Sequence, residues 1–169
     1  MNIEDRVDSL LRRLSGSPQY PSQGAVLFVD LAGRTSRRAY LPRQVLLDFL
    51  GGRGANMFLL YNLMDDGREP LDADIPLIFG TGVLTGSMPS AARGNVTSLA
   101  PDSDALMDSN AGDYFPSYMR YHGIDHIVLY HRHPQWTLLK IAEQTVEFVD
   151  ASPYLGLNNI DLTAAVERN

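Results

Sequence analysis

Residues 76–86 read PLIFGTGVLTG, and this stretch passes from strand-forming to turn-forming residues. Residues 75–79 are mostly apolar, which predicts a short strand. Glycine and threonine dominate residues 81–86 and predict a tight turn. Because backbone N–H groups in such turns hold anions, this turn is a candidate anion site. Arg93, in the loop of small residues that follows, is placed to complete it.

The glycines of this turn, Gly80, Gly82 and Gly86, lie one residue away from the spacing of a dinucleotide-binding fingerprint. Pro89 follows before any helix begins, so a pyrophosphate here would lack the helix N-terminus that dinucleotide folds use. The spacing therefore favours a tight turn that needs bare backbone over a Rossmann site.

Strands and helices follow one another irregularly on both sides of this motif. The patterns before it predict an amphipathic helix at 3–14, a strand at 25–30, a turn with Gly33 at positive φ, a return strand at 37–41 and helical segments at 42–50 and 57–64. The patterns after it predict a strand at 95–99, a helix at 113–121 capped by Asp113, a strand at 124–130 and a hairpin at 136–149. They also predict a last helix capped by Asn158 or Asn159. This order predicts an α+β fold of mixed sheets with packed helices. We expect a helix and linker over 1–24 and one domain over 25–169.

Composition limits the function. The chain has 169 residues, no cysteine and a net charge of −6. The missing cysteines exclude disulfides, thiolate catalysis and any cluster bound by this chain's own cysteines. The acidic balance argues against a nucleic-acid partner. No apolar run approaches the roughly 20 residues of a membrane span, and the N-terminus is too polar for a signal peptide, so we expect a cytoplasmic protein with no membrane partner.

Two clusters of polar residues contain side chains that bind metals, but neither cluster shows a full set of ligands. Four histidines lie close together in the sequence: His122, His126, His131 and His133. Their spacing fixes no third zinc ligand, so we interpret them as solvated surface residues. The acidic run of Asp102, Asp104, Asp108 and Asp113 has oxygen ligands for a hydrated Mg²⁺, but such a run is more typical of a solvated loop. No nucleophile with an adjacent base stands out.

Six segments together resemble one protein family. They are FLGGRGA (49–55), PLIFGTGVLTG (76–86), ARGNV (92–96), DSNAG (108–112), YHGIDHIV (121–128) and DASPYLG (150–156). In order and spacing they are similar to motifs in the N-terminal domain of the tungsten-dependent aldehyde ferredoxin oxidoreductases. The resemblance covers about residues 25–165 and implies an α+β base that cradles a bis-molybdopterin cofactor carrying tungsten, or molybdenum in some relatives.

The resemblance also implies roles for individual residues. Arg93 falls at a family arginine and is expected to contact a pterin phosphate, with Arg53 of the GGRG motif as a weaker candidate. The backbone carbonyl of Asn110 is expected to bind the Mg²⁺ that bridges the two phosphates. Three glycines are expected to let the backbone approach the cofactor: Gly82, Gly94 and Gly112. These roles suit the chemistry, because arginine pairs well with phosphate and Mg²⁺ prefers oxygen ligands.

The function implied by the resemblance is that of a pterin-cofactor-binding domain or subunit of an aldehyde-oxidising enzyme. Such an enzyme converts an aldehyde to a carboxylic acid and passes electrons to ferredoxin through an iron–sulfur cluster. Because this chain has no cysteine, the cluster would belong to the remaining domains or to a partner chain, and ferredoxin would be an indirect partner. The alternative is a stand-alone, non-catalytic module for binding or assembly. Such a module could associate with further copies of itself as a homo-oligomer. Residues 97–104, which include Asp102 and Asp104, stand where the family has a Lys-Ser-Pro segment, and this weakens the electrostatic attraction for a dianion.

Overall fold

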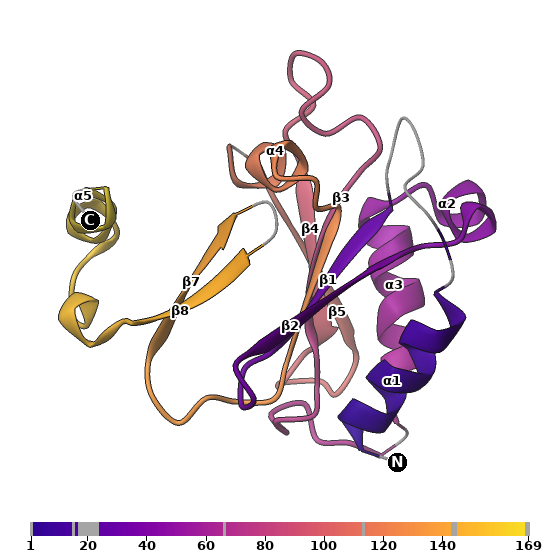
Figure 1. Cartoon of the computed structure of the whole chain (residues 1–169), viewed down its shortest axis with the longest axis horizontal. Coiled ribbons are helices and arrows are strands. Elements are labelled where there is room, and N and C mark those ends of the chain that lie inside the picture. Colours follow the sequence, from indigo (N-terminus) through magenta and orange to yellow (C-terminus); the bar gives the residue numbers. More distant parts are fainter. Residues whose placement is uncertain are drawn as a thin grey trace. The chain divides into compact units, whose positions relative to one another are not determined.

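The computed structural model describes residues 2–14, 16, 24–65, 67–112, 114–142 and 145–167. They form two compact units, over residues 1–132 and 133–169. The first unit contains both the 1–24 segment and most of the 25–169 domain that the sequence predicts. The predicted α+β class is confirmed (Figure 1).

The first unit is a mixed sheet with helices on its faces. Its elements are α1 (Ile3–Arg13), β1 (Ala25–Asp30), β2 (Thr35–Tyr40), α2 (Arg43–Phe49), α3 (Gly52–Leu63), β3 (Leu77–Thr81), β4 (Gly94–Leu99), β5 (Leu106–Ala111), α4 (Tyr114–Tyr121) and β6 (His126–Tyr130). The strand order is β2-β1-β6-β3-β4-β5. Only the β1–β6 pair is parallel among these neighbours.

The main core lies between the sheet and helices α1 and α3 (Figure 1). The apolar stripe of α1 buries Ile3, Val7 and Leu10 in this core. Asn2 begins that helix, because its side-chain oxygen accepts a hydrogen bond from the Asp5 N–H at 2.8 Å. Burial of the stripe is the main stabilising contribution of α1, since apolar side chains gain about 1.5–3 kcal/mol each on full burial.

Helix α4 packs against the other face of the sheet. Side chains alternate along a strand, so Ile78 of β3 enters the main core while Phe79 points the opposite way. The rings of Phe79 and Phe115, the second residue of α4, lie 5.9 Å apart in an edge-to-face arrangement. The sheet therefore has helical cover on both faces near β3.

The second unit holds a two-stranded hairpin and a terminal helix. Its elements are β7 (Thr137–Ala142), β8 (Thr145–Asp150), the 3-10 turn η1 (Ser152–Tyr154) and α5 (Asn159–Val166). The predicted hairpin is confirmed, although its turn at residues 143–144 lies outside the described residues. Asn158 caps α5 as expected, accepting hydrogen bonds from the N–H groups of Ile160 and Asp161, both at 3.0 Å.

Several local predictions are wrong for identifiable reasons. Arg34, and not Gly33, adopts positive φ in the turn after β1, because the Asp30 carboxylate accepts the Ala32 and Gly33 N–H groups and fixes the turn there. The sequence also failed to predict β5, because this edge strand is polar and largely exposed and so lacks the apolar alternation of a strand. The predicted Asp113 cap of α4 lies outside the described residues.

Candidate functional site

The six residues implied by the family resemblance meet at one end of the sheet. The antiparallel register places Thr81 of β3 opposite Gly94 of β4, and Gly94 opposite Ala111 of β5. Thus the segments that follow β3, precede β4 and follow β5 lie together. We call this the strand-end site, and its members are Arg53, Gly82, Arg93, Gly94, Asn110 and Gly112.

The N-terminus of α3 reaches the same place. Gly51 and Gly82 form an isolated antiparallel bridge, which ties the start of the helix to the turn after β3. Gly51 and Gly52 have φ of 76° and 52°, a region that favours glycine. The sharp turn that they permit brings Arg53 beside β5, where its Nη2 lies 3.2 Å from Oδ1 of Asp108. The helix start also contributes unpaired N–H groups and a positive dipole end.

The Asn110 backbone faces outward from the sheet. Ala100 donates its N–H to the Ala105 carbonyl at 2.8 Å, which identifies a bonded pair in the β4–β5 register. Bonded and non-bonded pairs alternate, so Asn95 and Asn110 form a non-bonded pair. The Asn110 carbonyl therefore points away from β4, and β5 is the outermost strand of the described sheet. Among the described strands, none lies on the side toward which this carbonyl points.

Arg93 lies at the mouth of the site. Its side chain is exposed, and within the described residues its guanidinium has no ion-pair partner. Its backbone is held in place, because Thr85 Oγ1 donates a hydrogen bond to the Arg93 carbonyl at 3.0 Å. The same hydroxyl accepts the Gly82 N–H at 3.1 Å. Thr85 thus joins the turn after β3 to the start of β4 and leaves the Arg93 side chain available for an anion.

A buried ion pair supports the turn at Gly82. Arg120 of α4 donates to the Gly82 carbonyl at 3.0 Å and lies 3.1 Å from Oδ1 of Asp125. Asp125 also accepts the Ala25 N–H at 3.0 Å. Burial raises the pKa of Asp125, although Arg120 and this N–H act in the opposite direction. Arg120 was not among the predicted site residues; the signal in the sequence was an arginine in the last turn of a helix shortly before a buried-type strand.

The three predicted glycines differ in what surrounds them. A methyl group at Gly94 would lie 2.7 Å from Cγ of Pro116, so packing against α4 accounts for this glycine. At Gly82 the nearest atom would be Thr85 Oγ1 at 3.6 Å, and around Gly112 there is open space. Packing therefore explains Gly94, while Gly82 and Gly112 are positions where a ligand has room to approach the backbone.

Behind the site lies a cluster of buried polar side chains, the amide network, made of His126, Asn56, Asn95 and Thr97. His126 is fully buried, so its interpretation as a solvated surface residue is wrong. Burial, with a smaller contribution from Arg120, lowers the pKa of His126 to about 3, so the ring is neutral. The available signals were polar residues in otherwise apolar elements: Asn56 among the leucines of α3, and Asn95 with Thr97 on one face of β4.

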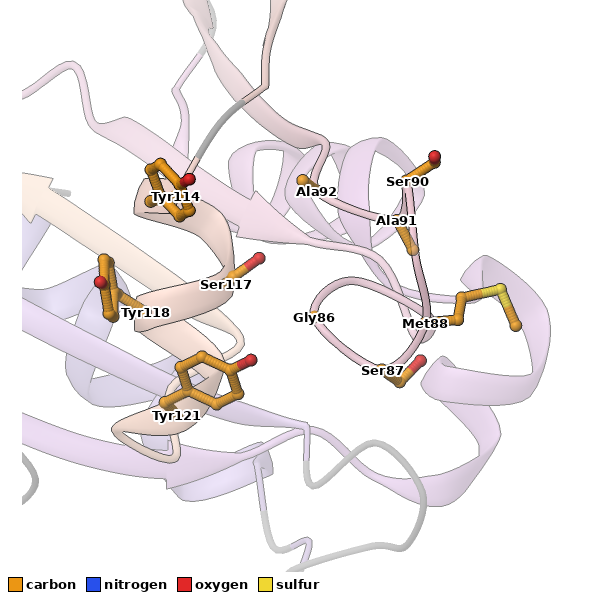
Figure 2. A pocket seen from close by; sticks show the side chains of 10 residues that line it. All are labelled: Gly86, Ser87, Met88, Ser90, Ala91, Ala92, Tyr114, Ser117, Tyr118 and Tyr121. Atoms are coloured by element: carbon orange, nitrogen blue, oxygen red, sulfur yellow. The ribbon is translucent and has the colours of Figure 1, made fainter.

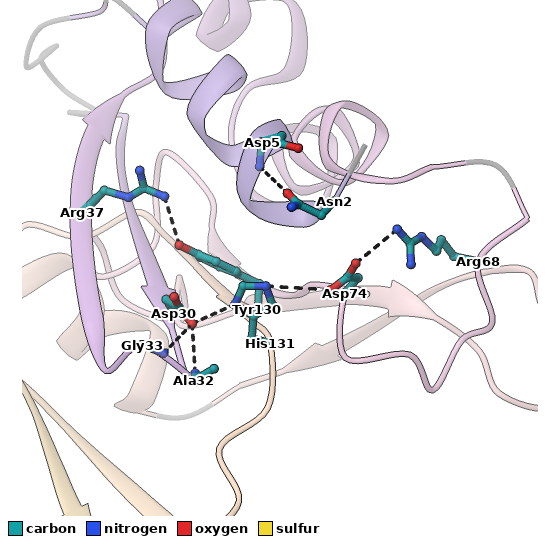
Figure 3. A network of polar contacts seen from close by, with 10 residues as sticks. All are labelled: Asn2, Asp5, Asp30, Ala32, Gly33, Arg37, Arg68, Asp74, Tyr130 and His131. Atoms are coloured by element: carbon teal, nitrogen blue, oxygen red, sulfur yellow. Dashed lines mark hydrogen bonds and ion pairs between the residues drawn. The ribbon is translucent and has the colours of Figure 1, made fainter.

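A second polar cluster lies at the opposite end of the sheet (Figure 3). His131 Nδ1 is 2.9 Å from Oδ1 of Asp30, and its Nε2 is 3.8 Å from Oδ1 of Asp74, which pairs with Arg68. We call these four residues the His131 cluster. Burial raises the pKa of Asp30, but hydrogen bonds from the Gly33 N–H and from His131 outweigh it, and the net pKa is lowered. Arg37 donates to the neighbouring Tyr130 hydroxyl at 3.1 Å.

The other histidines and aspartates that the sequence analysis weighed as metal ligands do not form a metal site in the described part of the chain. Among the described residues, no three His, Asp or Glu side chains are grouped closely enough to hold a metal ion. His133 instead hydrogen-bonds locally with Gln135 and Thr137. In the acidic run, Asp102 and Asp104 lie in an exposed turn as expected, but Asp108 belongs to β5 and contacts Arg53.

An open pocket of about 630 Å³ lies beside the loop that leads to Arg93 (Figure 2). One wall is α4, where Tyr114, Tyr118 and Tyr121 line the helix with rings 6.2 and 6.1 Å apart. Residues 86–88 and 90–92 form the other wall. The described lining residues offer hydroxyl groups and aromatic rings, and none of them carries a charged side chain.

The chain matches a known family model. The model described as "Aldehyde ferredoxin oxidoreductase, N-terminal domain" matches residues 26–169. A tungsten-containing aldehyde ferredoxin oxidoreductase of Thermococcus kodakarensis is 29% identical over 88% of this chain and 25% of its own length. The corresponding protein of Pyrococcus abyssi is 31% identical over 79% of this chain and 22% of its own length. The chain thus spans about a quarter of the curated relatives it matches.

A solved structure shares the fold. It is the "Active site complex BamBC of Benzoyl Coenzyme A reductase in complex with 1,5 Dienoyl-CoA", with a TM-score of 0.82 and 27% identity. The match covers 86% of this chain and 22% of that one. In the described part of this chain, no helix is both long and apolar enough to cross a bilayer.

Proposed function

Because this chain belongs to the aldehyde ferredoxin oxidoreductase family through its N-terminal domain, we propose that its strand-end site binds the phosphate end of a tungsten- or molybdenum-pterin cofactor. The observation that carries this proposal is the strand register, which unites segments far apart in sequence at one end of β3, β4 and β5. Elsewhere in the first unit, the described polar cluster around His131 presents carboxylates, which repel phosphate.

The residues at the site suit the phosphate and its counter-ion. Arg93 offers an exposed guanidinium, whose planar fork matches phosphate oxygens. The backbone around Gly82 and the first turn of α3 supply N–H donors and a dipole that favours an anion. The outward Asn110 carbonyl, with the nearby Asp108 carboxylate, offers the oxygen ligands that Mg²⁺ prefers. Arg53 partly neutralises Asp108, which reduces its repulsion of the phosphate.

When bound, the cofactor would supply the two-electron chemistry that converts an aldehyde to a carboxylic acid. This chain's own part is to hold one end of the cofactor. Its backbone at Gly82 and Gly112 leaves space for close approach, and Arg120 keeps the Gly82 carbonyl turned toward α4. No cysteine is available for an iron–sulfur cluster, so we infer that other domains or a partner subunit hold the cluster and pass electrons to ferredoxin. A cytoplasmic location also stays a prediction.

The test is retention of cofactor in protein purified together with the polypeptide that carries the remaining family domains. Tungsten and molybdenum are measured by mass spectrometry, and pterin by fluorescence after oxidation. We expect metal and pterin in the wild type and a loss of about tenfold in Arg93→Ala, because one charge-assisted phosphate contact is worth roughly 1.5–3 kcal/mol. The matched control is Arg12→Ala, which removes an exposed arginine of α1. This variant should retain the wild-type content of pterin and metal.

Two outcomes would contradict the proposal. Absence of pterin and metal from the wild-type assembly would favour the non-catalytic binding or assembly module. Equal cofactor content in Arg93→Ala and Arg12→Ala would show that the phosphate site has been assigned to the wrong residue.

A further inference from the structure

The amide network runs from the core to the strand-end site. His126 Nδ1 lies 2.8 Å from Asn56 Oδ1. Asn56 Nδ2 in turn lies 3.1 Å from Asn95 Oδ1 and 3.3 Å from Thr97 Oγ1. Each of these side chains is buried to at least 96%. Since buried polar groups are costly unless paired, this network fixes the relative position of α3, β4 and β6.

In the amide network, the donor and the acceptor of each hydrogen bond at Asn95 are determined by its partners. Thr97 donates to Asn95 Oδ1 at 2.6 Å, and Asn56 donates to the same oxygen. With its oxygen occupied by two donors, Asn95 presents its Nδ2 group to β5. There the Asp108 carboxylate can only accept, which enforces the same direction at the far end. The amide of Asn95 is therefore held in one orientation from both sides.

Three acceptors on β5 receive this Nδ2 group. They are Asp108 Oδ2 at 3.2 Å, the Ser109 carbonyl at 3.2 Å and Asn110 Oδ1 at 3.4 Å. Apart from its backbone pairing with β4, strand β5 has few buried side chains to hold it, because it is an edge strand with almost entirely exposed residues. Short exposed edge strands open easily. The Asn95 side chain is thus the buried anchor of the segment that contains Asp108 and Asn110.

We propose that Asn95 is the positioning residue of the strand-end site, whose buried amide sets where the Asn110 carbonyl and the Asp108 carboxylate lie. This inference rests on the proposed function, because those two groups are the oxygen ligands offered to the cation. Asn95 touches neither the cation nor the phosphate. It acts through β5, and its effect should disappear when β5 is held in another way.

The test exchanges the donor and the acceptor. In Asn95→Asp, the new carboxylate still accepts from Asn56 and Thr97 but has nothing to donate and repels Asp108. Adding Asp108→Asn restores a donor–acceptor pair of opposite direction. Amide hydrogen exchange on the full chain is followed for Ser109 and Ala111 of β5, with Phe79 of β3 as internal reference. We expect exchange at β5 about tenfold faster in the single variant and within about threefold of wild type in the double variant.

The binding measurement uses Mn²⁺ with inorganic pyrophosphate as the probe. Paramagnetic broadening of the Asn110 and Gly112 amide signals reports a cation at the site. We expect half-maximal broadening at about tenfold higher probe concentration in Asn95→Asp than in wild type. The double variant is read by exchange alone, because Asp108→Asn removes a proposed cation ligand. A role confined to global stability would speed exchange at Phe79 as well as at β5.

The outcomes separate the inference from the proposed function. Unchanged β5 exchange in Asn95→Asp overturns the inference, and so does faster exchange with unaltered probe binding. If Asn95→Asp does not fold, Asp108→Ala decides, since it removes an acceptor at the exposed edge without touching the core. Unaltered exchange in that variant also overturns the inference. If wild type shows no broadening, the proposed function fails, while the exchange data still decide whether Asn95 anchors β5.

Discussion

The polar side chains at the two ends of the six-stranded sheet differ in charge and in burial. At the end near Asp30, the His131 cluster joins the ionisable side chains of two aspartates, an arginine and a histidine, and all of them except Asp30 are partly exposed. At the other end, the amide network behind the strand-end site uses neutral groups that are completely buried. Exposed ionic groups that lose a partner are solvated by water, whereas a buried polar group that loses its partner is left unpaired, as His126 Nε2 is among the described residues. The buried, hydrogen-bonded polar side chains therefore lie at the end of the sheet where we propose a ligand.

The largest effect should come from the ion pair of Arg120 and Asp125, which joins α4 to the end of the sheet that carries the strand-end site. Arg120→Met leaves the buried Asp125 carboxylate without its cation, which should destabilise the fold by about 3–5 kcal/mol. Urea unfolding measures the change. Arg120→Lys keeps the charge but not the geometry that reaches both Asp125 and the Gly82 carbonyl, so it should lose less. A loss below about 1 kcal/mol in Arg120→Met would mean that the pair is effectively solvated.

Breaking the amide network should cost somewhat less. Asn56→Leu leaves the Asn95 oxygen short of one donor and the His126 ring without its acceptor, and we expect a loss of about 3 kcal/mol in urea unfolding. Asn62→Leu is the control on the same helix, because its side chain bonds locally to the Phe58 carbonyl and to Arg13 near the surface. Equal losses in the two variants would remove the distinction between buried and exposed amides.

The pH dependence of stability should reveal the buried histidine. The pKa of His126 is about 3 in the folded chain, against an ordinary value of 6.5, so below pH 6.5 the unfolded chain binds a proton that the folded chain does not. The free energy of unfolding should therefore fall by about 1.4 kcal/mol for each unit that the pH is lowered below 6.5, or by roughly 2 kcal/mol between pH 6.5 and 5. His126→Gln, measured by urea unfolding at the same pH values, should lack this slope. An unchanged slope in that variant would assign the effect elsewhere.

The smallest effect is expected at the His131 cluster. His131→Asn suits the backbone, because asparagine tolerates the φ of 59° at this position. Removal of the ring should raise the pKa of Asp30 toward 3.8, since His131 is one of the groups that lower it. The stability that this depressed pKa gives above pH 3.8 should fall by about 0.5–1 kcal/mol. Carboxyl carbon NMR measures the titration, and an unmoved Asp30 pKa would show that the backbone N–H groups alone set it.

The sequence alone predicted much of the fold and named candidate residues for the site. Local patterns gave the α1 stripe, the hairpin of β7 and β8 and the Asn158 cap, because periodicity and capping depend on neighbouring residues. Motif resemblance indicated Arg93 and Asn110, and their roles stay predictions. Strand β5 was missed because a polar edge strand carries no hydrophobic alternation, and its pairing with β4 is what holds it in the sheet.

Tertiary structure alone decided how these residues meet. Gly82, Arg93 and Asn110 are brought together by strand register, which depends on pairing between segments far apart in the chain. It also decided that Gly94 serves packing against Pro116, and that Asn95 lies between the core and β5. Sequence patterns identify residues whose chemistry suits phosphate and Mg²⁺. Only the folded sheet determines the distances and the burial that make an arginine available, a histidine neutral and an asparagine an anchor.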